Sequence, residues 1–275
     1  MRPTIPKSST SVLQLTDLHL DKLDPDQIDR LLNHVAKIDC DCVCITGDVS
    51  IARHLREHLA ALAAACAPRA VYMVCGNHDY YGSSVAAVDA VVKELCAETK
   101  NLHHLDGGQM IALNRHTCII GHRGWADARA GLGSRSHLKS PDHRAIRDFH
   151  GLRHQQAMLR MNRMGKESAE RIRRILPLAL TRYRHVILLT HVPPYEEVAR
   201  FNGRRCGNVH LPHFTNLSAG LAIRGIARAF PTRKITILSG HTHSHAVALV
   251  APNLCVRVAR PASTQSGSLK PLRFS

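Results

Sequence analysis

A chain of 275 residues with 44% hydrophobic content can bury one sizeable core. No apolar run approaches the roughly 18 residues of a membrane span, and residues 1–9 lack the apolar stretch of a signal peptide, so we expect neither a membrane partner nor export. The formal charge of +16 favours anionic partners such as nucleotides, nucleic acid or phosphorylated small molecules, although a coding bias toward arginine explains it equally well.

The first half of the chain alternates strand-like apolar runs with amphipathic helical segments. The expected strands cover 12–15, 42–45 and 70–75. A helix follows each strand: the first covers about 25–35, the second ends near 66 and the third starts at 84. This alternation predicts a parallel sheet with helices on both faces.

The second half of the chain is less regular. Residues 126–151 are predicted to form a long loop, which its length marks as functional or mobile. Helical sequence follows over about 152–182, interrupted near Gly165 and bent at Pro177, and the segment 144–184 concentrates the positive charge. The other expected elements are strands at 111–113, 117–121, 186–190, 235–239, 246–250 and 254–258, a loop at 193–214, a helix at 218–230 and a disordered tail at about 262–275.

The nine cysteines indicate a reducing compartment. Their number is odd, and Cys40, Cys42, Cys44, Cys75 and Cys118 all fall in apparent buried strands. Reduced structural thiols fit this pattern better than disulfides or a zinc site, so we expect a cytoplasmic protein.

Six short polar signatures stand directly after strand-like runs. They are Asp17-Leu18-His19, Gly47-Asp48, Gly76-Asn77-His78-Asp79, Gly121-His122, His191-Val192-Pro193-Pro194 and Gly240-His241-Thr242-His243. Open α/β sheets place their ligand sites at the carboxyl ends of strands. Oxygen and nitrogen ligands delivered from several such ends are typical of a site for hard or borderline divalent metals.

Apart from Gly121-His122, which is the weakest, the signatures in this order resemble the calcineurin-like metallophosphoesterase superfamily over about residues 12–260. The resemblance implies an α/β fold, a four-layer α-β-β-α sandwich, in a single domain over 1–275 with its core at about 10–260. It also implies a metal-dependent phosphoric ester hydrolase that uses two divalent cations. With no thiolate among the ligands, Mn²⁺, Fe²⁺ or Fe³⁺, and Zn²⁺ all stay open.

The same resemblance assigns metal ligands residue by residue. Asp17, His19 and His243 would bind the first metal, Asn77, His191 and His241 the second, and Asp48 would bridge both. A shared carboxylate offsets the charge of two cations only ~3.5–4 Å apart.

Two further residues receive catalytic roles from the resemblance. His78 would protonate the leaving oxygen, and Asp79 would hold the other ring nitrogen of His78. The implied mechanism is direct attack of a metal-bridging hydroxide on phosphorus.

Five residues are weaker candidates for substrate contacts. His122, Arg123 and Trp125 follow a strand, and Arg204 and Arg205 lie in the loop after His191, although ordinary loop roles explain all five. The charge slightly favours a phosphodiester or nucleotide-like substrate. A phosphomonoesterase or protein phosphatase, or a nucleic-acid-binding module with incidental hydrolysis, stays open, as does the oligomeric state.

Overall fold

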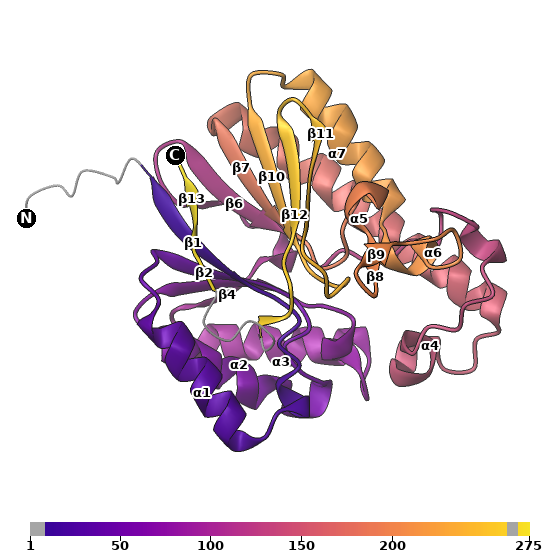
Figure 1. Cartoon of the computed structure of the whole chain (residues 1–275), viewed down its shortest axis with the longest axis horizontal. Helices are drawn as coiled ribbons and strands as arrows, with labels where there is room; N and C mark the ends of the chain where they lie inside the picture. Colours follow the sequence, from indigo (N-terminus) through magenta and orange to yellow (C-terminus); the bar gives the residue numbers. More distant parts are fainter. Residues whose placement is uncertain (1–8, 263–268) are drawn as a thin grey trace, which may run out of the picture.

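The computed structural model describes residues 9–262 and 269–275. Two multi-stranded sheets pack face to face, and helices cover the outer face of each (Figure 1). This arrangement confirms the predicted α-β-β-α sandwich. None of the helices in the described part is long and apolar enough to cross a membrane.

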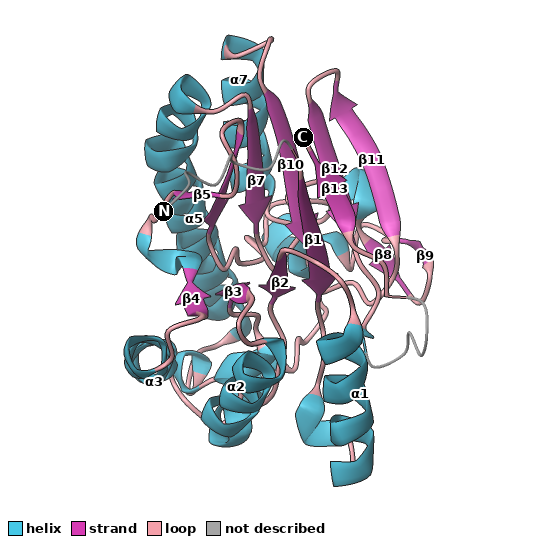
Figure 2. Cartoon of the chain, turned by 90° about the vertical axis from the view of Figure 1, so that its left-hand side faces the viewer, coloured by secondary structure: helices cyan, strands magenta, loops and turns pink. Residues whose placement is uncertain are grey.

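The first sheet is built from the amino-terminal half of the chain and the carboxyl end. Its order is β13-β1-β2-β3-β4, with β1 to β4 parallel and β13 antiparallel to β1. The strands are β1 (Thr10–Leu15), β2 (Cys42–Thr46), β3 (Ala70–Val74), β4 (Leu102–His104) and β13 (Leu272–Phe274). The helices α1 (Pro25–Lys37), α2 (Ala52–Cys66) and α3 (Val85–Glu98) lie together below this sheet (Figure 2).

Local capping explains where two of these helices begin. The Asp24 carboxylate accepts from the backbone N–H of Gln27, and the Gln27 side chain accepts from the backbone N–H of Asp24, with Pro25 at the first helical position. The Ser84 hydroxyl accepts from the backbone N–H of Ala87 at the start of α3.

Only one face of the first sheet is covered by helices, so the prediction of helices on both faces is wrong. Val43 and Ile45 of β2 pack toward α1, α2 and α3, whereas Cys42 and Cys44 pack in the layer between the two sheets. A strand buried on both faces is apolar throughout, and its sequence does not tell whether a helix or another sheet covers it. All nine cysteines are unpaired.

The second sheet has the order β11-β12-β10-β7-β6-β5, in which β12, β10, β7 and β6 are parallel. The strands are β5 (Ile111–Ala112), β6 (Thr117–Gly121), β7 (His185–Leu189), β10 (Lys234–Ser239), β11 (Ala246–Ala251) and β12 (Leu254–Val258). The pairs β5–β6 and β11–β12 are antiparallel, so the strands expected at 111–113 and 117–121, and those expected at 246–250 and 254–258, lie next to each other in the sheet. The helices α5 (His154–Arg182) and α7 (Leu217–Ala229) cover the outer face.

Helix α5 is continuous over 29 residues, so the predicted interruption near Gly165 is wrong. A Cβ atom at Gly165 would collide with the Cβ of Asp127. The glycine therefore permits close packing of the helix on the loop after β6 and does not break the helix.

Replacing Gly165 by alanine should destabilise the fold by about 1–3 kcal/mol, because the added methyl group overpacks this contact. Gly225 in α7 is a matched control, since nothing lies within 4 Å of the corresponding Cβ position. Gly225→Ala should instead stabilise the protein by roughly 0.5–1 kcal/mol through helix propensity. Urea unfolding of both variants checks this, and stabilisation by both would show that Gly165 has room.

The prediction of a disordered tail at 262–275 is wrong for the last residues of the chain. Leu272–Phe274 form β13, which pairs with β1 in the register Thr10↔Phe274, and Phe274 is buried between the sheets. Without β13, β1 would be an open edge, so long-range pairing orders a segment whose own composition does not. Residues 263–268 of the predicted tail lie outside the described residues.

The two long loops of the second half contain short elements that gather at one end of the molecule (Figure 1). These are α4 (Asp142–Ala145), β8 (Arg200–Phe201), β9 (Arg204–Arg205) and α6 (Leu211–Phe214). They border the site described next.

Candidate metal centre

The residues predicted as metal ligands follow the carboxyl ends of β1, β2, β3, β7 and β10. Five of them have a positive φ although none is glycine: Asp17, His19, Asp48, His241 and His243 lie between 45° and 69°. A positive φ at a residue other than glycine costs of order 1–3 kcal/mol of free energy. It persists only where the surrounding structure enforces it, which is common at functional sites.

Two glycines make room for the ligand carboxylates. A Cβ on Gly76 would collide with Oδ1 of Asp48, and a Cβ on Gly240 would lie 2.5 Å from Oδ2 of Asp17. The glycines in the Gly-Asn-His-Asp and Gly-His-Thr-His signatures are therefore required by close approach.

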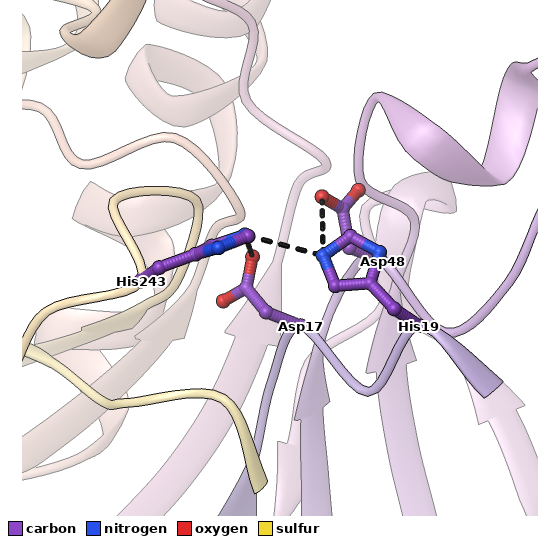
Figure 3. A group of neighbouring side chains, drawn as sticks. All are labelled: Asp17, His19, Asp48 and His243. Atoms are coloured by element: carbon purple, nitrogen blue, oxygen red, sulfur yellow. Dashed lines mark hydrogen bonds and ion pairs between the residues drawn. The ribbon is translucent and has the colours of Figure 1, made fainter. Parts of the chain in front are cut away.

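One cluster of ligand atoms comes from the ends of β1 and β2 and the loop after β10. Asp17, His19, Asp48 and His243 each contribute one atom, and these atoms all lie within 4.8 Å of one another (Figure 3). His243 Nε2 is 3.3 Å from Asp17 Oδ1 and 3.1 Å from His19 Nε2, and His19 Nε2 is 3.9 Å from Asp48 Oδ2.

A second cluster lies beside the first and shares Asp48. Asn77 Oδ1 is 3.0 Å from both His191 Nε2 and His241 Nδ1, and these two nitrogens are 3.2 Å apart. Asp48 Oδ1 is 3.3 Å from His191 Nε2. The two oxygens of Asp48 thus face different clusters, as a bridging carboxylate requires.

Hydrogen bonds on the far side of two rings orient them. His191 Nδ1 donates to the carbonyl of Thr46 at 2.7 Å, and His241 Nε2 donates to the carbonyl of His213 at 2.9 Å. The opposite nitrogen of each ring is therefore directed toward Asn77 and available as a ligand.

The charges of the site favour a cation. Burial lowers the pKa of His19 and of His241 to about 4, so both rings are neutral at pH 7. Burial also opposes charge on His191, yet the adjacent Asp48 carboxylate raises the pKa of His191 to about 10. A largely buried oxygen and nitrogen donor set, in which only His243 is exposed, fits two hard or borderline divalent ions because its carboxylates call for positive charge.

Two residues that were not predicted from the sequence hold the Asn77 amide. Asn77 Nδ2 donates to Asp142 Oδ1 at 2.8 Å, and the Tyr81 hydroxyl donates to the same oxygen at 2.6 Å. These bonds direct Asn77 Oδ1 toward the second cluster. The available signal was the long loop at 126–151, which contains Asp142, but nothing in its sequence indicated Asp142 itself.

Replacing Asp142 by alanine should weaken binding at the second metal position by roughly 10- to 100-fold, as is typical when the partner of a metal ligand is lost. The freed Asn77 amide can then rotate its oxygen away from His191 and His241. Titration of the metal-free variant with Mn²⁺ measures this. Equal weakening of both binding steps would contradict a role confined to Asn77.

His78 lies at the edge of the first cluster. Its ring stacks on Tyr81 with centroids 4.2 Å apart and meets the ring of His19 edge-on at 4.6 Å. The ring also lines the cavity described below, as a group that meets substrate must.

Asp79 does not hold the His78 ring, so that prediction is wrong. Within the described residues its carboxylate accepts hydrogen bonds from backbone N–H groups alone: those of Asp48, Val49, Ser50 and Gly76. Asp79 therefore ties together the turns after β2 and β3 that carry Asp48 and Asn77.

His122, Arg123 and Trp125 also lie elsewhere than predicted. The Arg123 guanidinium pairs with Asp89 and Asp106, and His122 Nε2 is 3.3 Å from Asp106 Oδ1. Trp125 is buried in the core. The turn after β6 directs these side chains away from the ligands, although the Arg123 carbonyl accepts from the His191 N–H at 2.8 Å.

A cavity of about 520 Å³ opens over the two clusters. Asp48, Asn77, His241 and His243 line it on the metal side. Arg204 and Arg205 are exposed on β9 and do not line it, but residues 201–203 at the tip of the same hairpin do. The volume is that of a small-molecule site.

The sequence profile of the calcineurin-like phosphoesterase family matches residues 10–245. Among curated proteins, no sequence matches this chain. A crystal structure of a dimetal phosphatase from Danio rerio is similar with a TM-score of 0.59 and 12% identity, covering 96% of this chain and 91% of that one. The protein TT1561 of Thermus thermophilus is similar with a TM-score of 0.58 and 11% identity, covering 98% and 99%. At these identities the likeness shows the fold alone.

Proposed function

The chain belongs to the calcineurin-like phosphoesterase family, and on this basis we propose that it hydrolyses a phosphoester with the help of two divalent cations. The observation that carries the proposal is the pair of ligand clusters joined by Asp48, whose two oxygens face different clusters. The similar Danio rerio protein is described as a dimetal phosphatase, which supports the same number of metals here.

The residues present would hold the two cations as the sequence pattern suggests. Asp17, His19 and His243 form one position and Asn77, His191 and His241 the other, with Asp48 between them. When bound, the cations supply Lewis acidity toward the phosphoryl oxygens and make water more acidic. The hydrogen bonds to His191, His241 and Asn77 keep their donor atoms in place, which spares reorganisation during the reaction.

We propose that His78 serves the leaving group. Its backbone N–H donates to Asp48 Oδ1 at 2.8 Å, which fixes the start of the turn, and Tyr81 supports one face of its ring. A half-buried imidazole in the cavity, beside the metal ligands, can deliver a proton to a departing alkoxide.

For the substrate, we propose a nucleotide-like ester or phosphodiester rather than a compact monoester. The net charge of +16, together with the exposed Arg204 and Arg205 on the hairpin whose tip lines the cavity, supports an anionic substrate that reaches beyond one phosphoryl group. A phosphomonoesterase, a protein phosphatase and a nucleic-acid-binding role are the competing outcomes of the test.

The test is hydrolysis of chromogenic mono- and diester substrates by protein loaded with Mn²⁺, Zn²⁺ or Mg²⁺. We expect turnover that disappears with a chelator, returns on addition of metal and is higher on diesters. Absence of turnover with every metal would contradict the proposed function, and a marked preference for compact monoesters would contradict the proposed substrate.

A further inference from the structure

The cavity over the metal ligands continues beyond them along a surface built from the second loop region. We call Phe201, His210 and Phe214 the aromatic wall. All three residues line the cavity and their rings contact one another, and the ring of Phe214 lies 5.1 Å from that of His241. The wall therefore begins at the metal centre and leads outward.

Phe201 gives the wall an open ring. It stacks on His210 at a centroid distance of 4.2 Å and meets Phe214 edge-on at 5.7 Å, so its neighbours fix its orientation. Even so, 40% of Phe201 is exposed, in a chain that has only 5 phenylalanines. An oriented, exposed aromatic ring inside a cavity is a stacking surface for another planar group.

His213 adds a polar group to the same cavity. It is 5% exposed and lines the cavity, yet neither ring nitrogen has a hydrogen-bond partner among the described residues. Its backbone carbonyl receives the bond from His241, so its position is fixed relative to the metal centre. Buried polar atoms normally have partners, so two unpaired nitrogens on a residue that lines the cavity suit a ligand that supplies a partner.

We propose that the aromatic wall and His213 form a subsite for a planar heteroaromatic ring, such as a nucleobase, on the leaving group of the substrate. The subsite rests on the proposed function, because the metal centre would hold the phosphoryl group while the ring lies against Phe201. The flat face of the substrate ring would stack on the aromatic wall, and polar atoms at the edge of that ring would form hydrogen bonds with His213. Lys139 on the rim of the cavity offers positive charge to a further anionic group.

Equilibrium binding of three phosphonates to Mn²⁺-loaded protein tests the subsite without turnover, because their C–P bond cannot be hydrolysed. The probes are the phosphonate analogues of AMP and of ribose 5-phosphate, and naphthylmethylphosphonate. The AMP analogue should bind about 5- to 150-fold more tightly than the ribose analogue, the range expected for stacking of one base on an aromatic side chain.

Phe201→Ala should remove most of the difference in affinity between the AMP analogue and the ribose analogue, and Phe201→Tyr should restore it. The metal content should be unchanged in both variants. Leu249→Ala is a matched control, since Leu249 on β11 is exposed and lies outside the cavity. His213→Leu should weaken the AMP analogue by about 2- to 12-fold, the value of one hydrogen bond, and leave the naphthyl probe unaffected.

Equal binding of the AMP and ribose analogues to the wild type would overturn the subsite, even if His213→Leu failed to fold. Naphthyl binding as tight as that of the AMP analogue would overturn the heteroaromatic preference. The outcomes also separate this inference from the proposed function. Ring-dependent binding without hydrolysis of any ester contradicts the function alone, and hydrolysis without ring-dependent binding contradicts the subsite alone.

Discussion

Replacing His78 by alanine is expected to lower kcat by roughly 10²–10⁴-fold on a substrate with a poor leaving group, while both metal ions stay bound. The ring contacts His19 and Tyr81 but none of its nitrogens is needed to complete either ligand cluster. The loss should therefore fall on proton transfer to the leaving oxygen and leave metal binding intact.

Steady-state kinetics on two esters that differ only in leaving-group acidity measure this effect. An acidic leaving group needs little protonation, so the same variant should lose much less activity on that ester. Elemental analysis of the variant provides the control for metal content. Losses of equal size on both esters would show that His78 does not act as the acid.

Replacing Asp48 by asparagine is expected to abolish the dinuclear centre. Asp48 is the one ligand shared by both clusters, and although burial opposes its charge, His191 and neighbouring histidines keep the pKa of its carboxyl well below the usual range. The amide removes the negative charge and leaves only one oxygen. Losing the hydrogen-bond partner of a metal ligand lowers metal affinity by roughly 10–100-fold, and losing the shared ligand itself should lower it further. Turnover should fall together with metal affinity.

Asp106→Asn is the matched control for Asp48→Asn. Asp106 is also buried and ion-paired, but its partners are His122 and Arg123 outside the cavity. Its replacement should lower the free energy of unfolding and leave the metal stoichiometry unchanged. Metal loss of the same size in both variants would mean that any buried charge change collapses the site.

The ligand set came from the resemblance of the signatures to a known family, and its meeting at one place was predictable because each signature stands just after a strand. Parallel strands bring their carboxyl ends to one edge, so Asp17, Asp48 and Asn77 meet although 60 positions separate the first from the last. The structure places all seven predicted ligands in the two clusters; their roles as ligands stay a prediction.

The surroundings of the ligands could not be predicted because they depend on packing between distant segments. Asp142 contacts Asn77 across 65 residues, and its loop has no periodic pattern that positions it. Arg123 and Trp125 stand after a strand in the same way as the ligands do. Their side chains turn to Asp106 and to the core because Asp106 and the buried ring of Phe149 lie there. The position of Arg123 and Trp125 in the chain showed at which edge of the sheet they lie, but it did not show in which direction their side chains point.

The most direct test of the account is the number of metal ions bound per chain. Protein stripped with a chelator, reconstituted with Mn²⁺ and freed of excess metal should contain two ions by elemental analysis, and Asp48→Asn should contain fewer. A wild-type value that stays at zero or one at saturating Mn²⁺ would contradict a centre in which Asp48 joins two metal positions.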